Sequence, residues 1–369
     1  MARQLTIADR VISDDSAAYV IAEIGHNHQG SLTTAKDIFR AAVESGASAV
    51  KLQKRENRSL FTREMFNKPY DNENSFGATY GEHREALEFS KSEYEALAAE
   101  AARLNVTFFA TAFDIPSADF LAELKRPAYK ISSGDLKNTP LMAHVARIGK
   151  PMIISTGGAT IEDVQRAYDV IMPINSQVCI LQCTAGYPAE NTELDLQVIA
   201  TYREQFPDAV IGYSGHDNGI AMPLAAYMLG ARVIEKHFTL SRSMKGTDHS
   251  FSLEPVGMKK MVRDLGRVQL ALGDGRKKVY ASEANPMLKM GKKLVAARNL
   301  PTGHVLTAAD VAVKSPGDGL PPYDLDRVLG QSLTRELHAD DAITADLLSS
   351  ATPTPAGHEN TSGKPASGA

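Results

Sequence analysis

The sequence has few cysteines, and their spacing argues against a disulfide. Cys179 and Cys183 are its two cysteines, and they lie four residues apart in one predicted strand. Alternation along a strand puts both side chains on the same face, too close to bridge without distortion. We therefore expect two reduced thiols, which are typical of a cytoplasmic protein.

The sequence also lacks a strong charge of one sign and any long apolar run. A net charge of −4 gives no overall basic field that would recruit nucleic acid or an acidic membrane. No apolar run reaches the roughly 18 residues that a membrane span requires. The N-terminal stretch MARQLTIADRVISDD lacks the apolar core of a signal peptide. We therefore expect neither nucleic acid nor a membrane among the partners.

What the sequence does contain is enough apolar material for a large core. Its 369 residues are 43% hydrophobic and 23% charged, which is ordinary for a globular protein. This length favours one large domain followed by one small domain.

Eight short apolar runs, rich in β-branched or aromatic residues, predict eight strands. They span residues 19–25, 49–53, 107–113, 128–134, 151–157, 177–183, 210–216 and 232–238. Helical patterns lie between them and after the last one, at residues 31–45, 90–101, from 139, 162–171, 194–205, 219–229 and 256–272. This alternation predicts an α/β fold, a (β/α)₈ TIM barrel.

A doubly wound open sheet is the structural alternative to the barrel. The first predicted βα turn reads GHNHQG at residues 25–30. Its glycine spacing does not match the dinucleotide-binding fingerprint of such sheets. The connection over residues 54–89 is far longer than usual βα loops, and we interpret it as a lid over the active face.

The pattern changes after residue 283. Short segments and turn-forming residues predict a small separate domain over residues 284–348, after a barrel domain over residues 1–283. The remaining residues, 349–369, are rich in Pro, Ser, Gly and Thr, and we predict a disordered tail.

Polar residues collect at the carboxyl ends of the predicted strands, where barrel active sites lie. Because side chains alternate along a strand, Lys51 and Gln53 share one face, and so do Glu235 and His237. We expect His237 to point into the barrel mouth. The strand ends carry Glu23, Lys51, Gln53, Thr111, Lys130, Ser133, Ser155, Thr184, Ser214, His216, Glu235 and His237.

Two lysines and two histidines at these ends predict different chemistry. Lys51 and Lys130, with the neighbouring hydroxyls, make a cationic pocket for phosphate, carboxylate or both. A Schiff-base lysine is the chemical alternative. His216 and His237 end adjacent strands, where two neutral imidazoles can bind a divalent metal and leave positions for water and substrate. Hydrogen-bonded or acid–base histidines are the alternative.

Three further residues lie in turns next to these strands. His26 and His28 follow the first strand, and we interpret both as loop histidines that contact solvent or substrate. Asp248 follows the eighth strand in the stretch KGTDHS, where a turn-forming acid is the simplest interpretation.

Several ordered motifs together resemble the N-acetylneuraminate (sialic acid) synthase family. They include YVIAEIGHNHQG, TYGEHREALEFS, YKISSGD, PMIISTGGAT, CTAGYP, IGYSGHDNG and IEKHFTLSRSMKGTDHSFSLEP. The stretch LVAARNLPTGHVLTAADVAVKSPGDG resembles that family's antifreeze-like (SAF) domain. The resemblance covers residues 15–348.

The resemblance implies that the chain condenses phosphoenolpyruvate with an N-acylhexosamine, typically N-acetylmannosamine, to give a nonulosonic acid and phosphate. It implies a divalent metal held by His216 and His237, with Mn²⁺ first and Mg²⁺ or Co²⁺ as alternatives. It also implies a homodimer in which the small domains are exchanged. The implied phosphoenolpyruvate-binding residues are Lys51, Thr111, Lys130, Ser133, Ser155 and Ser214, and those facing the sugar or the reacting carbons are Glu23, Gln53, Tyr187 and Asp248.

Two positions depart from the family pattern. Ser315 stands where bacterial-type members have an arginine that reaches the sugar of a partner subunit, and Ala185 replaces an asparagine found in some members. The first departure leaves a legionaminic- or pseudaminic-type synthase as the alternative. A Schiff-base aldolase and a non-catalytic carbohydrate-binding protein are more distant alternatives.

Overall fold

The computed structural model describes residues 3–350, and in it eight parallel strands close into a barrel. Each strand pairs with the next along the chain, and β10 returns to pair with β3. The closed ladder confirms the (β/α)₈ prediction and excludes the open sheet. The strands are β3 (Tyr19–Gly25), β4 (Ala49–Lys54), β5 (Thr107–Ala112), β6 (Tyr129–Ile131), β7 (Met152–Ser155), β8 (Val178–Cys183), β9 (Val210–Gly215) and β10 (Val233–His237).

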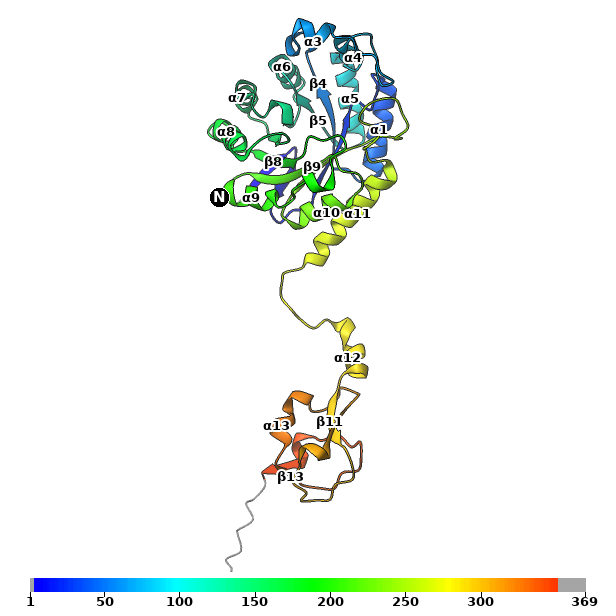
Figure 1. The fold of residues 1–369 in the computed structure, drawn as a ribbon, viewed down its shortest axis with the longest axis vertical. Helices are drawn as coiled ribbons and strands as arrows, with labels where there is room; N and C mark the ends of the chain where they lie inside the picture. The colour runs from blue at the N-terminus through cyan, green and yellow to red at the C-terminus, as the bar shows by residue number, and fades with distance from the viewer. Residues whose placement is uncertain (1–2, 351–369) are drawn as a thin grey trace, which may run out of the picture. The chain divides into compact units, whose positions relative to one another are not determined.

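A helix covers the outside of the barrel after each strand, and Figure 1 shows these helices as a ring around the sheet. Polar side chains cap several of them; Ser90, for example, forms a capping box with Glu93. The helices are α1 (Leu32–Glu44), α5 (Lys91–Arg103), α6 (Ile115–Glu123), α7 (Thr139–Arg147), α8 (Ile161–Ile171), α9 (Val198–Gln205), α10 (Ala221–Met228) and α11 (Pro255–Leu272).

Helix α6 is the one helix of this ring that the sequence patterns above omit. Asp114 caps its first turn by accepting a hydrogen bond from the backbone of Ser117, and Pro116 lies in that turn. An N-cap acid followed by proline is a standard helix start. The signal was therefore present in the sequence, in the capping residues and not in a repeating apolar pattern.

Each barrel strand has one face toward the helices and one toward the barrel interior. The interior face is apolar near the amino ends of the strands, where Ile21, Phe109 and Val233 join one buried cluster. Two residues further along each strand, the same face carries Glu23, Thr111 and Glu235. The amino end of such a strand therefore contributes to the core, and its carboxyl end contributes to the binding site.

An antiparallel hairpin that the sequence analysis did not predict precedes the barrel. Strands β1 (Gln4–Ile7) and β2 (Arg10–Ser13) pair with each other. Leu5, Ile7 and Ile12 are fully buried in the same cluster as the interior residues of the barrel. The hairpin thus extends the barrel's interior core at the amino ends of the strands.

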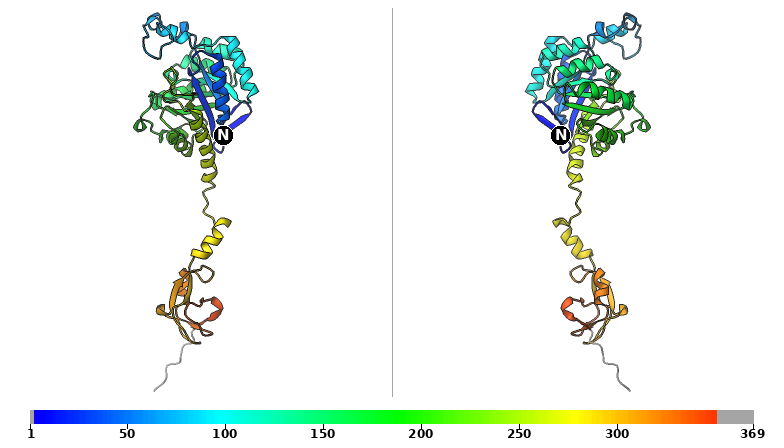
Figure 2. Two further views of the ribbon diagram at one scale, coloured as in Figure 1. Left: turned by 90° about the vertical axis from the view of Figure 1, so that its right-hand side faces the viewer. Right: turned by 90° about the vertical axis from the view of Figure 1, so that its left-hand side faces the viewer.

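The long connection after β4 is built of short helices. These are α2 (Asn57–Leu60), α3 (Arg63–Asn67) and α4 (Tyr80–Glu85), and Figure 2 shows this light-blue segment standing out from the helix ring. Gly81 packs so closely on Phe66 that an added Cβ would lie 2.4 Å from its ring. The connection therefore has its own packing, and its action as a lid stays a prediction.

The chain divides into two compact units, Met1–Asp274 and Gly275–Ala369; the sequence analysis placed the division after residue 283. The second unit has its own core around Leu294, Leu306 and Leu333. Of the predicted tail, residues 351–369 lie outside the described residues. The unit's elements are α12 (Ala284–Met290), β11 (Lys293–Ala296), β12 (Val311–Lys314), α13 (Leu325–Val328), β13 (Gln331–Leu333) and β14 (Leu348–Ser350).

No helix within residues 3–350 combines the length and the apolar character needed to cross a membrane.

Candidate active site

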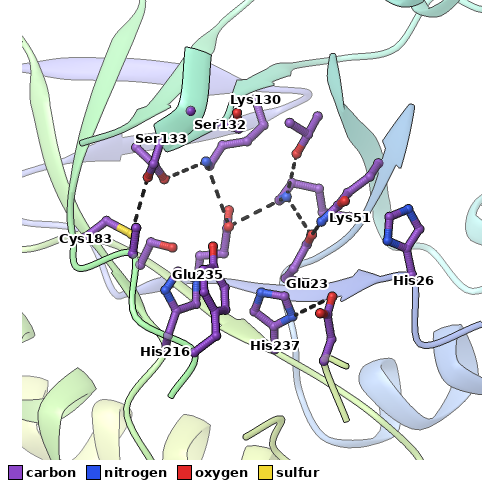
Figure 3. Close-up of a pocket in the computed structure, with 18 of the residues that line it drawn as sticks. Glu23, His26, Lys51, Lys130, Ser132, Ser133, Cys183, His216, Glu235 and His237 are labelled. Carbon is purple, nitrogen blue, oxygen red and sulfur yellow. Dashed lines mark hydrogen bonds and ion pairs between the residues drawn. The ribbon is translucent and has the colours of Figure 1, made fainter. Parts of the chain in front are cut away.

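A cavity of about 510 Å³ lies at the carboxyl ends of the barrel strands. Figure 3 shows side chains from several strands converging on it. The strand-end Thr184 does not line this cavity, although its carbonyl oxygen contacts His216. Every residue that the family resemblance implied for the site does line it: Glu23, Lys51, Gln53, Thr111, Lys130, Ser133, Ser155, Tyr187, Ser214, His216, His237 and Asp248.

The two lysines are buried and held by short polar contacts. Lys51 Nζ lies 2.6 Å from Glu23 Oε2 and donates to Thr111 Oγ1 at 2.8 Å. Lys130 Nζ donates to Ser155 Oγ at 2.6 Å. Both ammonium groups therefore have fixed positions, as the binding of a small dianion requires.

Glu235 lies between the two lysines, as Figure 3 shows. Its Oε1 atom is 3.6 Å from Lys51 Nζ and 4.0 Å from Lys130 Nζ. In the sequence, Glu235 is a strand-end residue for which no role was predicted. An acid shared by two lysines becomes visible only when β10, β4 and β6 meet across the closed barrel.

The two buried carboxyl groups are pushed toward opposite protonation states. Burial raises the pKa of Glu23 to about 7, although the nearby Lys51 opposes this shift. Burial also acts to raise the pKa of Glu235, but the charges of Lys130 and Lys51 outweigh it and hold that pKa below its usual value. Separated pKa values in adjacent acids are a mark of acid–base sites.

The two histidines face each other, with ring centroids 5.4 Å apart. His216 Nδ1 lies 2.8 Å from the carbonyl oxygen of Thr184, which favours the tautomer with a free lone pair on Nε2. Burial lowers the pKa of His237, so its imidazole is neutral near pH 7. Its Nδ1 atom is buried without a hydrogen-bond partner in the described part of the chain and lies 3.7 Å from Asp248 Oδ2.

These features fit a divalent metal held by two imidazoles. The unpartnered buried ring nitrogen of His237 and the free Nε2 lone pair of His216 are donors of the kind that such an ion needs. Residues 3–350 contain no group of three or more His, Cys, Asp or Glu side chains arranged to hold a metal. The remaining coordination positions would therefore belong to water and substrate.

A bulge at the end of β3 positions Glu23. The β3–β4 register shifts between Glu23 and Gly25, and Gly25 has a φ of +54°, which favours glycine. An added Cβ at Gly25 would lie 2.8 Å from Asp248 Oδ2. Glu23 then accepts a hydrogen bond from Gln53 Nε2 at 2.8 Å, so the bulge brings three site residues together.

The expectation for His28 is wrong. Its ring stacks on Phe89 at 4.3 Å, and its Nδ1 atom accepts a hydrogen bond from the backbone of Gly30. His28 is 1% exposed, because the turn after β3 folds back under the segment that leads to α5. Its neighbour His26 does line the cavity.

Several more lining residues were not predicted from the sequence, among them two arginines and a cysteine. Arg55 and Arg84 come from the long connection, and Cys183 ends β8. Both Cys179 and Cys183 are free, as predicted. Arg84 carries no strand-end signal, because its position depends on the fold of the connection, whereas Arg55 directly follows β4.

Comparisons with known proteins agree with this geometry. The NeuB family profile matches residues 38–277, and the SAF domain profile matches residues 293–349. Human N-acetylneuraminate-9-phosphate synthase is 39% identical over 340 residues, covering 92% of this chain and 95% of the human protein.

Two other relatives are more distant. The N,N'-diacetyllegionaminic acid synthase of Campylobacter jejuni is 33% identical over 328 residues, covering 88% of this chain and 98% of that protein. The crystal structure of N-acetylneuraminic acid (sialic acid) synthetase from Leptospira borgpetersenii superposes with a TM-score of 0.68 at 30% identity. It covers 78% of this chain and 95% of that one.

Proposed function

The chain belongs to the NeuB family and is an enzyme of the sialic acid synthase type, and we propose that it condenses phosphoenolpyruvate with an N-acylhexosamine. The products are a nonulosonic acid and inorganic phosphate. The observation that carries the proposal is the convergence of two lysines, two histidines and two acids on one cavity.

The acceptor sugar is the less determined substrate. The human relative is named for a 9-phosphate product and the Campylobacter relative for a legionaminic acid. We therefore propose that the acceptor is N-acetylmannosamine or a close relative of it. The relative would carry a phosphate or a further acetamido group. A legionaminic- or pseudaminic-type acceptor is the alternative, because Ser315 replaces the arginine described above.

Phosphoenolpyruvate binds on the side of the cavity that carries the two lysines. Lys51 and Lys130 neutralise its carboxylate and phosphate, and fixed hydroxyls supply further donors. Glu235 holds the two lysines at a set separation while it remains ionised. The hydroxyls come from Thr111, Ser133, Ser155 and Ser214.

The reaction forms one C–C bond and one C–O bond to water, and it breaks the C–O bond to phosphate. The methylene carbon of phosphoenolpyruvate attacks the sugar aldehyde, and the aldehyde oxygen takes up a proton. The electron pair leaves an oxocarbenium centre at the former C2 carbon. Water adds there and gives up a proton, and the tetrahedral centre then releases phosphate to leave the ketone.

Glu23 is the residue we assign to the water step. It is buried beside Lys51 and its pKa lies near 7, so it can accept a proton from water at neutral pH. Its carboxylate charge also stabilises the cationic centre. Gln53, Tyr187 and Asp248 orient the sugar.

The proposed site also includes a divalent metal, for which Mn²⁺ is our first choice. When bound by His216 and His237, it would supply Lewis-acid polarisation of the aldehyde oxygen. The protein's part is to hold both imidazoles in place and to leave open positions beside them.

The decisive experiment incubates the purified protein with phosphoenolpyruvate, Mn²⁺ and a panel of N-acyl sugars. We expect phosphate release that depends on the sugar, and a product whose mass equals sugar plus pyruvate. Protein trapped by borohydride in the presence of substrate would instead indicate a Schiff-base aldolase. No phosphate release with any acceptor would favour a non-catalytic binding protein.

We also propose a homodimer with exchanged SAF domains. Its support is the separate core of the second unit, together with the resemblance described above.

A further inference from the structure

The cavity wall carries three basic side chains with no role in the reaction described above. Arg55 Nη1 lies 2.9 Å from His26 Nε2, and Arg84 Nη1 lies 3.1 Å from His26 Nδ1. His26 follows β3, Arg55 follows β4 and Arg84 lies in α4. All three line the cavity, and we refer to them as the rim cluster.

The rim cluster holds more hydrogen-bond donors than it can satisfy internally. A neutral imidazole has one acceptor nitrogen, whereas a guanidinium faces each ring nitrogen of His26. A protonated ring would have none. Arg84 Nε is also buried without a hydrogen-bond partner among the residues described. At least two N–H groups therefore lack an acceptor, which is costly in a buried site.

The positive charge of the rim cluster is also uncompensated. Neither Arg55 nor Arg84 has a carboxylate within 4.0 Å in the portion of the chain from residue 3 to residue 350, and Arg55 is only 7% exposed. Of the acids whose charges act on Arg55, Glu88 is paired with Lys54 at 2.8 Å, and Asp248 lies beside His237. An anionic ligand would satisfy both the spare donors and the charge.

The rim cluster is separated from the phosphoenolpyruvate lysines by a chain of short contacts. Lys51 meets Glu23 at 2.6 Å, Gln53 Nε2 donates to Glu23 at 2.8 Å, and Arg55 Nη2 donates to Gln53 Oε1 at 2.6 Å. In Figure 3, His26 lies beyond Lys51, on the side away from Lys130. The cluster therefore faces a part of the cavity that the phosphoenolpyruvate proposed above does not fill.

We propose that the rim cluster binds a phosphate monoester carried by the acceptor sugar, at the end of the sugar remote from its aldehyde. This inference rests on the proposed function and narrows its acceptor to a hexosamine 6-phosphate. The aldehyde carbon is C1 of the open chain, so C6 is its far end. The carboxylate and the phosphate of phosphoenolpyruvate then lie beside the two lysines. The phosphate of the sugar lies at the rim cluster.

The chemistry of the cluster favours phosphate over carboxylate. Two guanidinium forks present several N–H groups in fixed planes, which match the three terminal oxygens of a phosphate monoester. Arg55 lies over the Phe113 ring, with its Cζ atom 3.6 Å from the ring centroid. A carboxylate offers only two oxygens and one charge, and would leave donors of the second fork unpaired.

The test compares N-acetylmannosamine with its 6-phosphate, using the full-length protein, phosphoenolpyruvate and Mn²⁺. We expect kcat/KM for the 6-phosphate to exceed that for the unphosphorylated sugar by at least about 100-fold. In Arg55→Gln and in Arg84→Gln, kcat/KM for the 6-phosphate should fall by about 10- to 100-fold, mainly through KM, since one charged hydrogen-bond donor is lost. The preference for the 6-phosphate should shrink accordingly.

Arg58→Gln is the matched control, because it removes the same charge from the same connection. The Arg58 guanidinium pairs with Glu85 at the surface and lies over the Phe66 ring, so its kinetics should match those of the wild type. Thermal unfolding checks that each variant is folded. If Arg55→Gln does not fold, Arg84→Gln alone decides the test, because Arg84 as a whole residue is only partly buried.

Three results would overturn the inference. Equal use of both sugars by the wild type would show that no phosphate subsite exists, while leaving the proposed condensation intact. A raised KM for phosphoenolpyruvate in the arginine variants, with an unchanged KM for the sugar phosphate, would assign the cluster to the other substrate. No product from either sugar, although Mn²⁺ and phosphoenolpyruvate are present, would remove the proposed function itself.

Discussion

At the scale of single residues, the site depends on where each buried charge finds its partner. Glu23 and Glu235 have the same side chain and lie on neighbouring strands, yet one pKa is raised and the other lowered. The difference comes from the lysines, since Glu235 is shared by two of them and Glu23 contacts one. Identical groups can thus take different roles in one cavity.

The pKa of Glu23 predicts a pH dependence. Because burial raises this pKa to about 7, the basic form gains population as the pH rises through 7. We expect log kcat/KM to rise over that interval in the wild type. Glu23→Gln should lower kcat/KM by about 100-fold or more and remove the inflection. A persistent inflection near pH 7 in the variant would assign it to another group.

The proposed metal ligand His237 can be tested by a measurement of thermal stability, which does not require turnover. Mn²⁺ should raise the thermal midpoint of the wild type, because an ion that binds only the folded state stabilises it. The His237→Ala variant should show little such rise and no chelator-sensitive activity. His144→Ala is the control, because that histidine pairs with Asp119 on α6, outside the cavity lining. Full chelator-resistant activity of the wild type would refute the metal role.

At the scale of secondary-structure elements, strand ends and turns decide which side chains meet. The interior face of each barrel strand changes from apolar to polar along its length, so one element serves both core and site. The bulge between Glu23 and Gly25 then breaks the β3–β4 register at the cavity. Bulges of this kind redirect side chains next to active sites.

Gly25→Ala tests the bulge. The alanine would be strained at a φ of +54°, and its Cβ would lie 2.8 Å from Asp248 Oδ2. We expect the free energy of unfolding to fall by about 1–3 kcal/mol, and the KM for the sugar to rise more than that for phosphoenolpyruvate. Urea unfolding and steady-state kinetics measure the two effects.

Gly149→Ala separates the steric effect from the backbone effect. Gly149 has a φ of +73°, but nothing lies within 4 Å of an added Cβ, and it precedes β7 at the opposite end of the strand from the cavity. Gly149→Ala should lower the free energy of unfolding by about as much as Gly25→Ala does. It should leave KM unchanged for both substrates. Equal kinetic effects at both glycines would argue against a special role for the bulge.

At the scale of the whole molecule, the chain has two units with separate cores. The buried clusters of the barrel lie before residue 275, and that of the second unit contains Leu294 to Leu347. Each unit therefore has the apolar interior that independent folding requires.

A fragment of residues 1–274 should accordingly fold by itself. We expect circular dichroism to show cooperative thermal unfolding of this fragment. Light scattering should give the full-length chain a mass of twice 39.8 kDa, and the fragment a lower association state if the second unit holds the dimer together. A monomeric full-length chain would contradict the domain exchange, and a fragment that does not fold would contradict the independence of the cores.

Much of the fold and the candidate site could be predicted from local patterns. Eight apolar runs with polar ends, such as those leading to Lys51 and His237, identified the barrel and its carboxyl-end residues, because side-chain alternation is a property of each strand alone. The hairpin β1–β2 and the burial of His28 could not be predicted in this way. They depend on which surfaces remain uncovered once the barrel has closed.

The sequence by itself determined the alternation of barrel strands and helices, the faces of the strands, and the strand-end residues that meet in the cavity. Only the tertiary structure decided how their charges are distributed. Glu235 between two lysines and the unpaired Arg55 and Arg84 at the rim join residues that are distant in the chain. Pairwise electrostatics depends on separation in space and on burial, and both exist only after folding.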